Sequence, residues 1–585
     1  MEALIQQLRE RHIWRALIAY PGAAFILLEA VDFFVDNYEL NQKLITASVI
    51  VVVGGLPVAL LWNWYHGRPG RQALGRQELW SYGLITVATF IAAGWYWATI
   101  PNALGEGFVG RGSSADQSIA VLPFEVVDGT TDIEFLSDGL AESLINTLSA
   151  LPELRVIARS SAFALRDLAD HPEEVGRQLN VGKVLVGRLE RRGEDLIVSA
   201  TLVGTRDNSQ LWGDRFVRPM AEVLHLEEAI ASSIVDSLRL KLSDRAADRI
   251  SQRAAADPVA YRHYLQGRFL AHGSTADEVD RGLVHLREAT RLDPSFPLAY
   301  TGIADAMIVK AFFSTSPPSE IVGEARTAAH SAIALDPELS EAHTALGSIR
   351  FFFDHDWQGS EEAFRTAIAL GPTNSTTYYR YANLLIGLLR FDEAVDIAER
   401  AVEIDPLSTG ALHAVGFAKL WAGDFEGAAE AFGHAIEIHP GWTWGHVKKG
   451  LSHALAGQHA EALVLAERAE ELSEGWGSAF LQGWLAWIYS VTDSRELLDR
   501  TVERVEHGME ENRIEDPIAV VATYLAAGDL ARALDWAERT VEAGSPNAVF
   551  MSGFLGEHMD PLAPSGFRES PRFLAALRRM GLPQN

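Results

Sequence analysis

Two stretches of this chain, Phe391–Pro406 (FDEAVDIAERAVEIDP) and Phe425–Pro440 (FEGAAEAFGHAIEIHP), lie 34 residues apart and share one pattern. In both, small residues recur at helical spacing and a proline closes the stretch. A third proline, Pro372, lies another 34 residues before Pro406. The pattern predicts helices that a proline ends before the next unit begins.

Small residues at fixed offsets from these prolines extend the pattern, since Ala or Gly lets two antiparallel helices approach closely. The predicted packing positions are Ala382, Ala394, Ala398, Ala401, Pro406, Gly416, Ala428, Phe432, Ala435 and Pro440, followed without a proline by Gly450, Ala462, Ala466 and Ala469. A period of 34 residues with this pattern is the signature of the tetratricopeptide repeat. We therefore predict an all-α tetratricopeptide superhelix of about eight units over residues 255–550 and a C-terminal cap over 551–585.

The composition narrows the class of protein. A chain of 585 residues is too long for one core, and 48% hydrophobic residues with 22% charged residues argue against broad disorder. The net charge of −28 makes nucleic acid an unfavourable partner, because binding to phosphates depends on clustered Lys and Arg. The absence of cysteine excludes disulfides, thiolate metal sites and a cysteine nucleophile.

Residues 1–105 carry hydrophobic stretches that predict a membrane anchor. Leu44–Tyr65 and Leu79–Gly105 contain no formal charge and are long enough for a transmembrane helix, which needs about 20 residues. Ala16–Leu28 is shorter, so the anchor has two or three spans. The predicted spans cover residues 14–35, 44–65 and 80–102.

Charges beside these stretches predict the orientation of the anchor. Three arginines precede the first stretch and three lie between the second and the third: Arg9, Arg11, Arg15, Arg68, Arg71 and Arg76. The positive-inside rule places both segments in the cytoplasm. We therefore expect a bacterial inner-membrane protein with a cytoplasmic N-terminus, a linker over residues 106–117 and soluble domains in the periplasm.

Residues 118–242 contain both runs typical of strands and spacings typical of helices. Ser118–Phe124 (SIAVLPF) and Leu154–Ala158 are apolar runs typical of strands, whereas Phe135–Leu151 has apolar residues at helical spacing. Further strands are predicted over 183–189, 196–202 and 210–216, and further helices over 161–179 and 220–242. The mixture predicts an α/β domain with a single sheet.

The stretches FLSDGLAESLINTLSALPELRVIARSSAFAL and VGKVLVGRLERRGEDLIVSATLVGTRDNSQLWGDRF, together with SIAVLPF, resemble the TolB amino-terminal-like (FlgO-like) domain. The resemblance covers about residues 118–242. It implies an envelope protein of Gram-negative bacteria, in which such a domain lies between membrane helices and tetratricopeptide repeats. Some relatives carry a cyclase, kinase or winged-helix module on the cytoplasmic side. Only about a dozen residues precede the first stretch here, so no such module is expected.

Candidate ligand-binding residues lie at predicted helix starts of the α/β domain. Asp138, Gly139 and Glu142 could form an acidic site, although acidic residues at a helix start are also favoured by the helix dipole. Arg159 and Ser160 follow a strand, where free N–H groups could bind an anion or a serine could simply cap the helix.

Candidate partner-binding residues in the repeats are aromatic. Tyr378, Tyr379, Trp442 and Trp444 could line a peptide groove or pack between helices. Asp354-His355-Asp356 offers three metal ligands, but it falls in a turn between helices and favours a solvated turn.

No GxSxG, HExxH, Walker or dinucleotide-binding motif occurs in a suitable context, so we predict no catalytic residue, metal or cofactor and do not expect an enzyme. The favoured hypothesis is a membrane-anchored envelope scaffold that binds protein or peptide partners through the repeat groove. The alternative is a signalling or sensing protein whose α/β domain binds a small anionic ligand and modulates the repeat surface. Hydrolase or cyclase activity is a third, weaker hypothesis. Self-association is left open, and nucleic acid is not expected.

Overall fold

The computed structural model describes residues 118–127, 133–149, 154–238, 257–271, 276–313, 318–473, 478–511, 513–514 and 516–584. The chain divides into two units, residues 1–112 and 113–585, and every described residue belongs to the second. The predicted membrane spans and the linker lie outside the described residues. Within the described ranges, no helix combines the length and the hydrophobicity needed to cross a bilayer.

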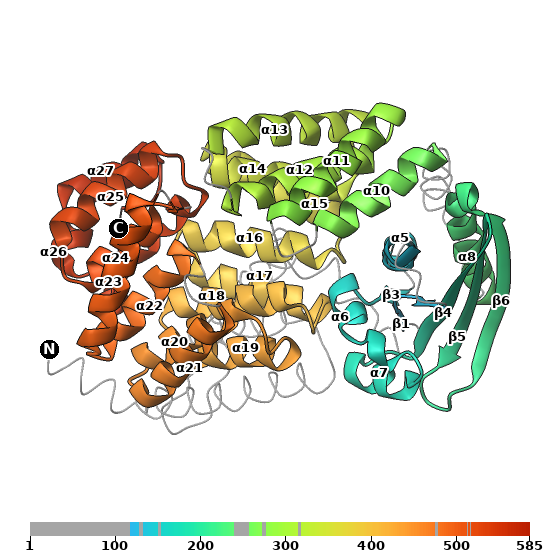
Figure 1. Ribbon diagram of the computed structural model, residues 1–585, viewed down its shortest axis with the longest axis horizontal. Helices are drawn as coiled ribbons and strands as arrows, with labels where there is room; N and C mark the ends of the chain where they lie inside the picture. The colour runs from blue at the N-terminus through green and yellow to red at the C-terminus, as the bar shows by residue number, and fades with distance from the viewer. Residues whose placement is uncertain are drawn as a thin grey trace, which may run out of the picture. The chain divides into compact units, whose positions relative to one another are not determined.

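The α/β domain is built on one mixed sheet with the strand order β3-β1-β4-β5-β6 (Figure 1). Its strands are β1 (Ser118–Val121), β2 (Glu125–Val126), β3 (Arg155–Val156), β4 (Lys183–Arg192), β5 (Asp195–Gly204) and β6 (Gln210–Pro219). β1 pairs in parallel with β3 and β4, whereas β4, β5 and β6 are antiparallel. The predicted single sheet is confirmed. The β4–β5 hairpin extends beyond its predicted ends because the turn at Gly193, with a φ of 68°, lets Arg192 pair with Asp195.

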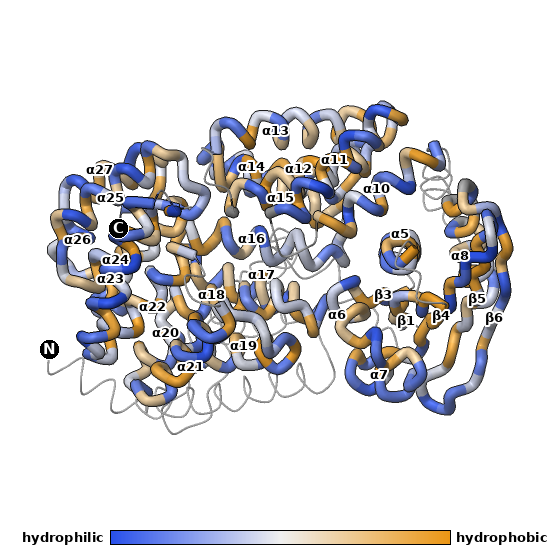
Figure 2. Tube along the Cα trace, in the orientation of Figure 1, coloured by the Kyte–Doolittle hydropathy of each residue, from blue (hydrophilic) through white to orange (hydrophobic). Residues whose placement is uncertain are grey.

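Four helices flank this sheet: α5 (Glu134–Leu148), α6 (Arg159–Ala164), α7 (Pro172–Leu179) and α8 (Val223–Ser237). Hydrophobic residues are concentrated on α5, β1 and β4, which form the core of the domain (Figure 2). The prediction of one helix over 161–179 is wrong. The chain breaks after α6 and starts again at Pro172, because proline has no N–H to continue a helix but suits its first position.

Eight antiparallel helix pairs follow in the described part of the chain (Figure 1). The first helices of the pairs are α10 (Pro258–Ala271), α12 (Pro297–Phe313), α14 (Ser340–Ile349), α16 (Ser375–Gly387), α18 (Thr409–Ala422), α20 (Thr443–Leu455), α22 (Ala479–Val491) and α24 (Ile518–Ala526). The second helices are α11 (Ala276–Leu292), α13 (Pro318–Leu335), α15 (Trp357–Leu370), α17 (Phe391–Ile404), α19 (Phe425–Ile438), α21 (His459–Leu472), α23 (Arg495–Glu510) and α25 (Leu530–Glu542). A π-helical turn, η5 (Arg350–Asp354), extends α14.

Small residues set the distance between the helices of a pair. A Cβ atom on Gly416 of α18 would lie 2.7 Å from Cε1 of Phe432 on α19, so only glycine allows this approach. The alanines of the repeat pattern are fully buried: Ala382, Ala394, Ala398, Ala401, Ala428, Ala435, Ala462, Ala466 and Ala469. Pro406 and Pro440 each follow a second helix by two residues and mark its end. The 34-residue pattern therefore coincides with one helix pair.

The first helices form the inner layer of the superhelix. Each contacts its counterpart in the next pair, as α16 contacts α18, α20 contacts α22 and α22 contacts α24. They are buried on several sides, whereas second helices such as α17 bury a single stripe and expose the rest. The surface formed by the first helices is called the inner surface below.

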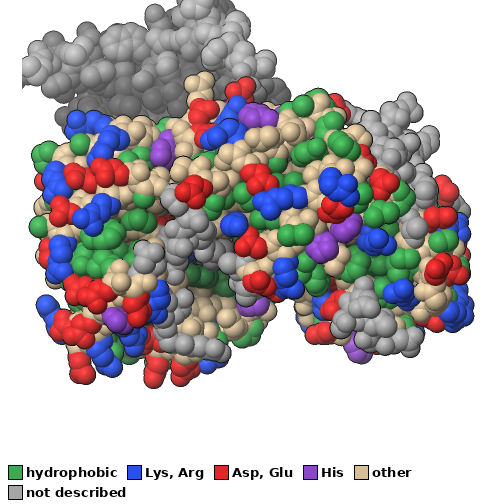
Figure 3. Space-filling view, turned by 45° about the horizontal axis from the view of Figure 1, so that its top comes forward, with side chains coloured by type: hydrophobic (Ala, Val, Ile, Leu, Met, Phe, Trp, Pro, Cys, Tyr) green, Lys and Arg blue, Asp and Glu red, His purple; other side chains and the backbone are tan. Residues whose placement is uncertain are grey.

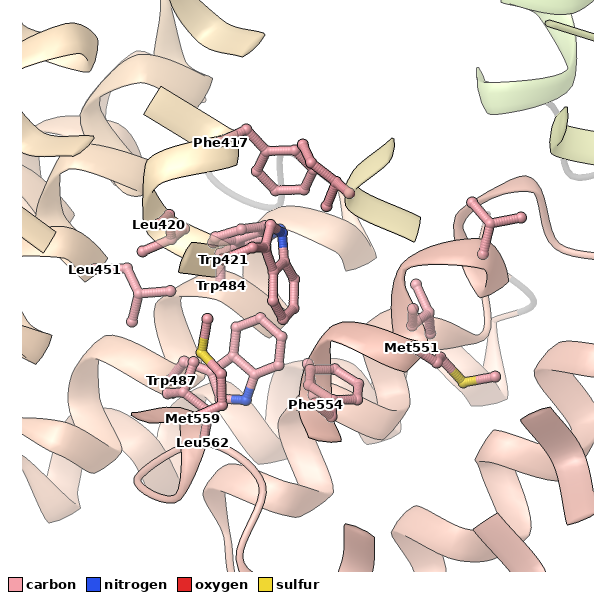
Figure 4. Packing of buried hydrophobic residues seen from close by; sticks show 14 of the residues in the cluster. Phe417, Leu420, Trp421, Leu451, Trp484, Trp487, Met551, Phe554, Met559 and Leu562 are labelled. Carbon is pink, nitrogen blue, oxygen red and sulfur yellow. The ribbon is translucent and has the colours of Figure 1, made fainter. Parts of the chain in front are cut away.

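The chain covers part of its own inner surface. After α25 it forms a 3-10 segment, η6 (Pro546–Leu555), which packs on η5 and α16. Phe554 of η6 lies with its ring centroid 5.7 Å from Trp421 and 5.7 Å from Trp487 (Figure 4). Phe550 lies 5.3 Å from Phe417. These contacts fall on the C-terminal halves of α18 and α22.

Hydrogen bonds fix this returning segment. Ser552 Oγ donates to the carbonyl of Gly387 at 2.7 Å, where α16 ends. Trp357 Nε1 donates to the carbonyl of Met580 at 3.1 Å, near the end of the chain. Two short helices, α26 (Ser565–Arg568) and α27 (Pro571–Arg579), complete the cap against α25. The cap thus begins at Pro546 and reaches back along the superhelix.

Candidate functional site

A small cavity lies where α5 and α6 of the α/β domain meet α10 of the first repeat. Four of the residues predicted as a ligand site line it together: Asp138, Gly139, Glu142 and Arg159. The repeat contributes Tyr264 and Arg268, among others, to its wall. Residues far apart in sequence therefore meet between the two domains.

Helix geometry brings the cavity residues together. Asp138 and Glu142 are four residues apart on α5, so both face α10. Gly139 lies between them, and a Cβ there would come 2.9 Å from Leu265 Cδ2. Glycine at this position therefore allows α5 to pack closely on α10.

The charges of the cavity are compensated within the protein. Glu142 accepts from Arg268 Nη2 at 2.5 Å and lies 3.1 Å from Arg159 Nε. Asp138 accepts from Arg166 Nη2 at 3.2 Å. Burial raises the pKa of Asp138, and Arg166 and Arg159 oppose that shift. A small anion would have to displace Glu142 from its arginines to bind here.

Ser160 lies outside this cavity, in an exposed position on α6. Its neighbour Ser161 is buried and donates from its backbone N–H to Oδ1 of Asp405 at 2.8 Å. The Ser161 hydroxyl hydrogen-bonds the same oxygen, and Ser160 adds a side-chain hydrogen bond to this carboxylate. The start of α6 does bind an anion, namely the carboxylate of Asp405 at the end of α17.

Sequence analysis missed Asp405. In the sequence, the only feature that marks Asp405 is its position before Pro406, at the end of a predicted helix. The carboxylate is 1% exposed, and Ser375 Oγ donates to it at 3.3 Å from α16 of the same helix pair. Burial raises the pKa of Asp405, whereas the hydrogen bonds from Ser161 lower it. The serine pair at 160–161, which offers donors at a helix start, was the signal that an acceptor must lie nearby.

A second buried carboxylate joins the domains at α8. Glu227 is 4% exposed and accepts from the Tyr261 hydroxyl of α10 at 2.5 Å. Ser143 and Thr147 of α5 also donate to Glu227. Burial, with the charge of Glu227, raises the pKa of Tyr261 well above its ordinary value. The α/β domain and the first repeats are therefore held together by satisfied buried polar groups.

The aromatic residues predicted for the groove differ in exposure. Tyr378 is buried, and its hydroxyl donates to the carbonyl of Pro372 at 3.1 Å, so it packs between repeats. Tyr379, Trp442 and Trp444 are half-buried. Trp444 lies 5.4 Å from Phe480 of α22, measured between ring centroids. Three of the four therefore keep part of their surface accessible.

Trp444 belongs to a continuous row on the inner surface, called the inner strip: His413, Phe417, Trp444, Lys448, Phe480 and Trp484. The ring centroids of His413 and Phe417 are 5.3 Å apart, and those of Phe480 and Trp484 are 6.2 Å apart. Lys448 lies between the two pairs, with Nζ 4.8 Å from the Phe417 ring and 5.2 Å from the Trp484 ring. The strip crosses α18, α20 and α22 and borders the region that η6 covers, because Phe417 also contacts Phe550 of η6.

Lys448 is an unusual member of the strip, because it is 7% exposed and forms no ion pair with a carboxylate of the described residues. Its ammonium hydrogen-bonds Nε2 of His413. Burial lowers the pKa of Lys448 to about 7, and burial with the charge of Lys448 lowers the pKa of His413. Sequence analysis missed this residue, since one lysine in an amphipathic helix reads as a surface charge.

The three side chains of the Asp354-His355-Asp356 turn contact different partners. Asp354 pairs with Arg326, and Asp356 accepts from the backbone N–H of Gly359 and caps α15. His355 stacks on Trp357. Among the described residues, no group of three or more His, Asp or Glu side chains is arranged as a metal site.

Comparison with known proteins gives limited matches. No protein-family model matches the chain. A curated protein of Rhizobium meliloti (strain 1021), "Putative adenylate cyclase 3", is 29% identical over 192 residues. The match covers 32% of this chain and 32% of that protein, so the chain spans about a third of the length of that relative.

Solved structures similar to parts of the chain include a tetratricopeptide protein and a pilus biogenesis factor. YrrB, described as a TPR protein with an unusual peptide-binding site, is 18% identical, with 32% of this chain and 92% of YrrB covered at a TM-score of 0.24. PilW, a type IV pilus biogenesis factor, is 15% identical, with 37% of this chain and 94% of PilW covered at a TM-score of 0.31.

The contacts of Asp405 predict that the protein loses stability when this carboxylate is removed. We expect Asp405→Ala to lower the free energy of unfolding by about 2–4 kcal/mol, because it leaves the buried donors of Ser161 without an acceptor. Hydrogen exchange measured by mass spectrometry should become faster in the peptide spanning residues 155–168. Asp405→Asn keeps an oxygen acceptor and should cost less than half as much. Equal effects of Ala and Asn, with unchanged exchange in this peptide, would contradict the assignment.

The lowered pKa of Lys448 predicts a stability that depends on pH. Between pH 7 and the ordinary lysine value of 10.5, the unfolded chain binds the proton that the folded chain has released, so stability rises with pH through this window. Lys448→Met removes the buried ammonium and should stabilise the protein by about 1–4 kcal/mol at pH 6.5. The gain should shrink toward pH 10 in thermal unfolding. Lys449→Met, on the half-buried neighbour, is the matched control. A gain that stays constant over this range would refute the lowered pKa.

Proposed function

We propose that this protein is a membrane-anchored scaffold of the bacterial envelope that binds an extended protein segment on the inner strip. The observation that carries the proposal is the division of the inner surface. The segment η6 contacts Phe417 and Trp421 of α18 and Trp487 of α22, whereas Trp444 of α20 and Phe480 of α22 are half-buried and contact each other. Aromatic residues, tryptophan in particular, are enriched in the hot spots of protein interfaces.

The strip defines the chemistry of the partner. Trp444 and Phe480 offer accessible ring surface, which suits aliphatic or aromatic side chains. Lys448 has no carboxylate partner among the described residues, so an acidic group that reaches it would favour its charged form. An extended segment that alternates apolar and acidic residues would satisfy both. On the face that Figure 3 shows, acidic and basic side chains alternate and form no large basic area, which also supports a protein partner rather than nucleic acid.

The α/β domain contributes rigidity in this proposal. Its contacts with the repeats run through Asp405, Glu227 and Glu142, all of which accept hydrogen bonds or ion pairs across the boundary. The alternative of a small-anion sensor has less support, because the arginines of its cavity already pair with Glu142 and Asp138. We also propose that the chain has no enzymatic activity of its own. The name "Putative adenylate cyclase 3" describes the Rhizobium meliloti relative, and we do not extend that activity to this chain.

Binding to the strip can be tested with a random peptide display library on the detergent-solubilised full chain. We expect enriched peptides to combine apolar and acidic residues. The double substitution Trp444→Ala with Phe480→Ala should weaken their binding about tenfold or more in fluorescence polarisation, since hot-spot aromatics typically contribute 2 kcal/mol or more. Val464→Ala, on the exposed side of α21, is the matched control and should leave affinity unchanged. Enriched peptides that bind the double variant as tightly as the native chain would refute the strip as the site.

The anchor is proposed from sequence, on the uncharged stretches 44–65 and 79–105 and the arginines of the loop between them. Reporter fusions after residue 74 and residue 115 test it. We expect alkaline phosphatase to be active at 115 and inactive at 74, with green fluorescent protein showing the reverse. A cytoplasmic signal at both positions would exclude a periplasmic location and redirect the search for partners.

A further inference from the structure

The segment η6 packs on the inner surface in the way that a bound peptide would. It spans ten residues as a 3-10 helix, although such helices rarely exceed about four residues because their hydrogen-bond geometry is poor. Its conformation therefore depends on the helices that it covers. Phe550 contacts Phe417 of α18, and Phe554 contacts Trp421 of α18 and Trp487 of α22. Two aromatic side chains four positions apart thus bind η6 to two different first helices.

The surface beneath η6 offers hydrogen-bond donors that η6 does not use. The indole nitrogens Nε1 of Trp421 and Trp487 are buried and have no hydrogen-bond partner among the described residues. The two side chains are 4% and 5% exposed, and both lie next to Phe554 (Figure 4). A buried donor without an acceptor is unfavourable. The segment η6 therefore matches the apolar part of this surface but leaves two polar groups for a different occupant.

We propose that η6 is a displaceable occupant of a second peptide-binding surface, and that a partner segment with two aromatic residues four positions apart takes its place. Backbone carbonyl oxygens of that segment accept from the indole N–H groups of Trp421 and Trp487. This surface borders the inner strip at Phe417, whose ring centroid lies 5.3 Å from that of Phe550 and 4.8 Å from Nζ of Lys448. The inference goes beyond the proposed strip site, because it concerns the surface that η6 covers.

An occupant from the same chain keeps this surface closed to weak partners. Because η6 is tethered, it competes with any partner at a high effective concentration. Two side-chain hydrogen bonds help to hold it in place. Ser552 Oγ donates to the carbonyl of Gly387 at 2.7 Å, and Nε2 of His558, in the 3-10 turn η7 (Glu557–Met559), bonds the carbonyl of Trp421 at 2.8 Å. Only a partner that offers comparable apolar surface and the missing acceptors displaces η6.

Gly553 of η6 allows a test that removes no side chain. A Cβ at Gly553 would lie 2.4 Å from Cε3 of Trp421, so Gly553→Val should hold η6 away from the surface. The probe is a fluorescein-labelled peptide that copies residues 545–559, added to the full chain in detergent. We expect fluorescence polarisation to show about tenfold tighter binding, or more, to Gly553→Val than to the native chain, because the tethered competitor is weakened. Adding Trp421→Ala should remove that gain.

Gly323→Val is the matched control, because a Cβ at Gly323 on α13 has no neighbour within 4 Å. It should bind the peptide as weakly as the native chain does. Thermal unfolding of each variant shows whether it is folded. Equal affinity of the folded Gly553→Val variant and the native chain would overturn the proposal. The inner strip would stand in that case, because its own test uses other peptides and other substitutions.

Hydrogen exchange of the native chain decides the question even if Gly553→Val does not fold. A displaceable segment must open without unfolding of the repeats. We expect the amides of residues 548–555 to exchange about 100-fold faster, or more, than those in the middle of α18 and α22. Equal protection would show that η6 opens only when the whole superhelix unfolds, and that result would also overturn the proposal.

Discussion

The close approach of helices at small residues is the constraint on which the rest of the superhelix depends. Gly416 against Phe432 leaves no room for a Cβ, and the alanines of the repeat pattern on α17, α19 and α21 are fully buried. Because each pair is held this tightly, the first helices pack directly on one another. The result is a continuous inner layer, on which both the cap and the inner strip are built.

Buried carboxylates unite the two domains. Asp405 and Glu227 are each almost fully enclosed; Asp405 accepts from Ser161 of the α/β domain, and Glu227 accepts from Tyr261 of the first repeat. An unpaired carboxylate at such depth would be strongly destabilising, so these contacts hold only when both partners are docked. The boundary between the α/β domain and the repeats therefore behaves as a fixed joint rather than a flexible linker contact.

Sequence predicted the features that local patterns encode. The 34-residue period located helix pairs, and the short apolar runs located the strands of the single sheet. Asp138, Glu142 and Arg159 were singled out as candidate site residues, but Arg268 and Tyr264, which complete their cavity, lie more than a hundred residues away. The break at Pro172 was missed because helical periodicity continues through it.

Long-range packing explains the remaining differences. Nothing in the sequence around Phe550 and Phe554 indicates that this segment returns to α18 and α22, because its partners belong to earlier repeats. Yet that return decides which aromatic residues of α18 and α22 are covered. By enclosing Trp421 and Trp487, the cap makes them part of the core and leaves Trp444 and Phe480 as the accessible aromatic surface. The location of the proposed partner site is therefore set by the end of the chain as much as by the repeats that form it.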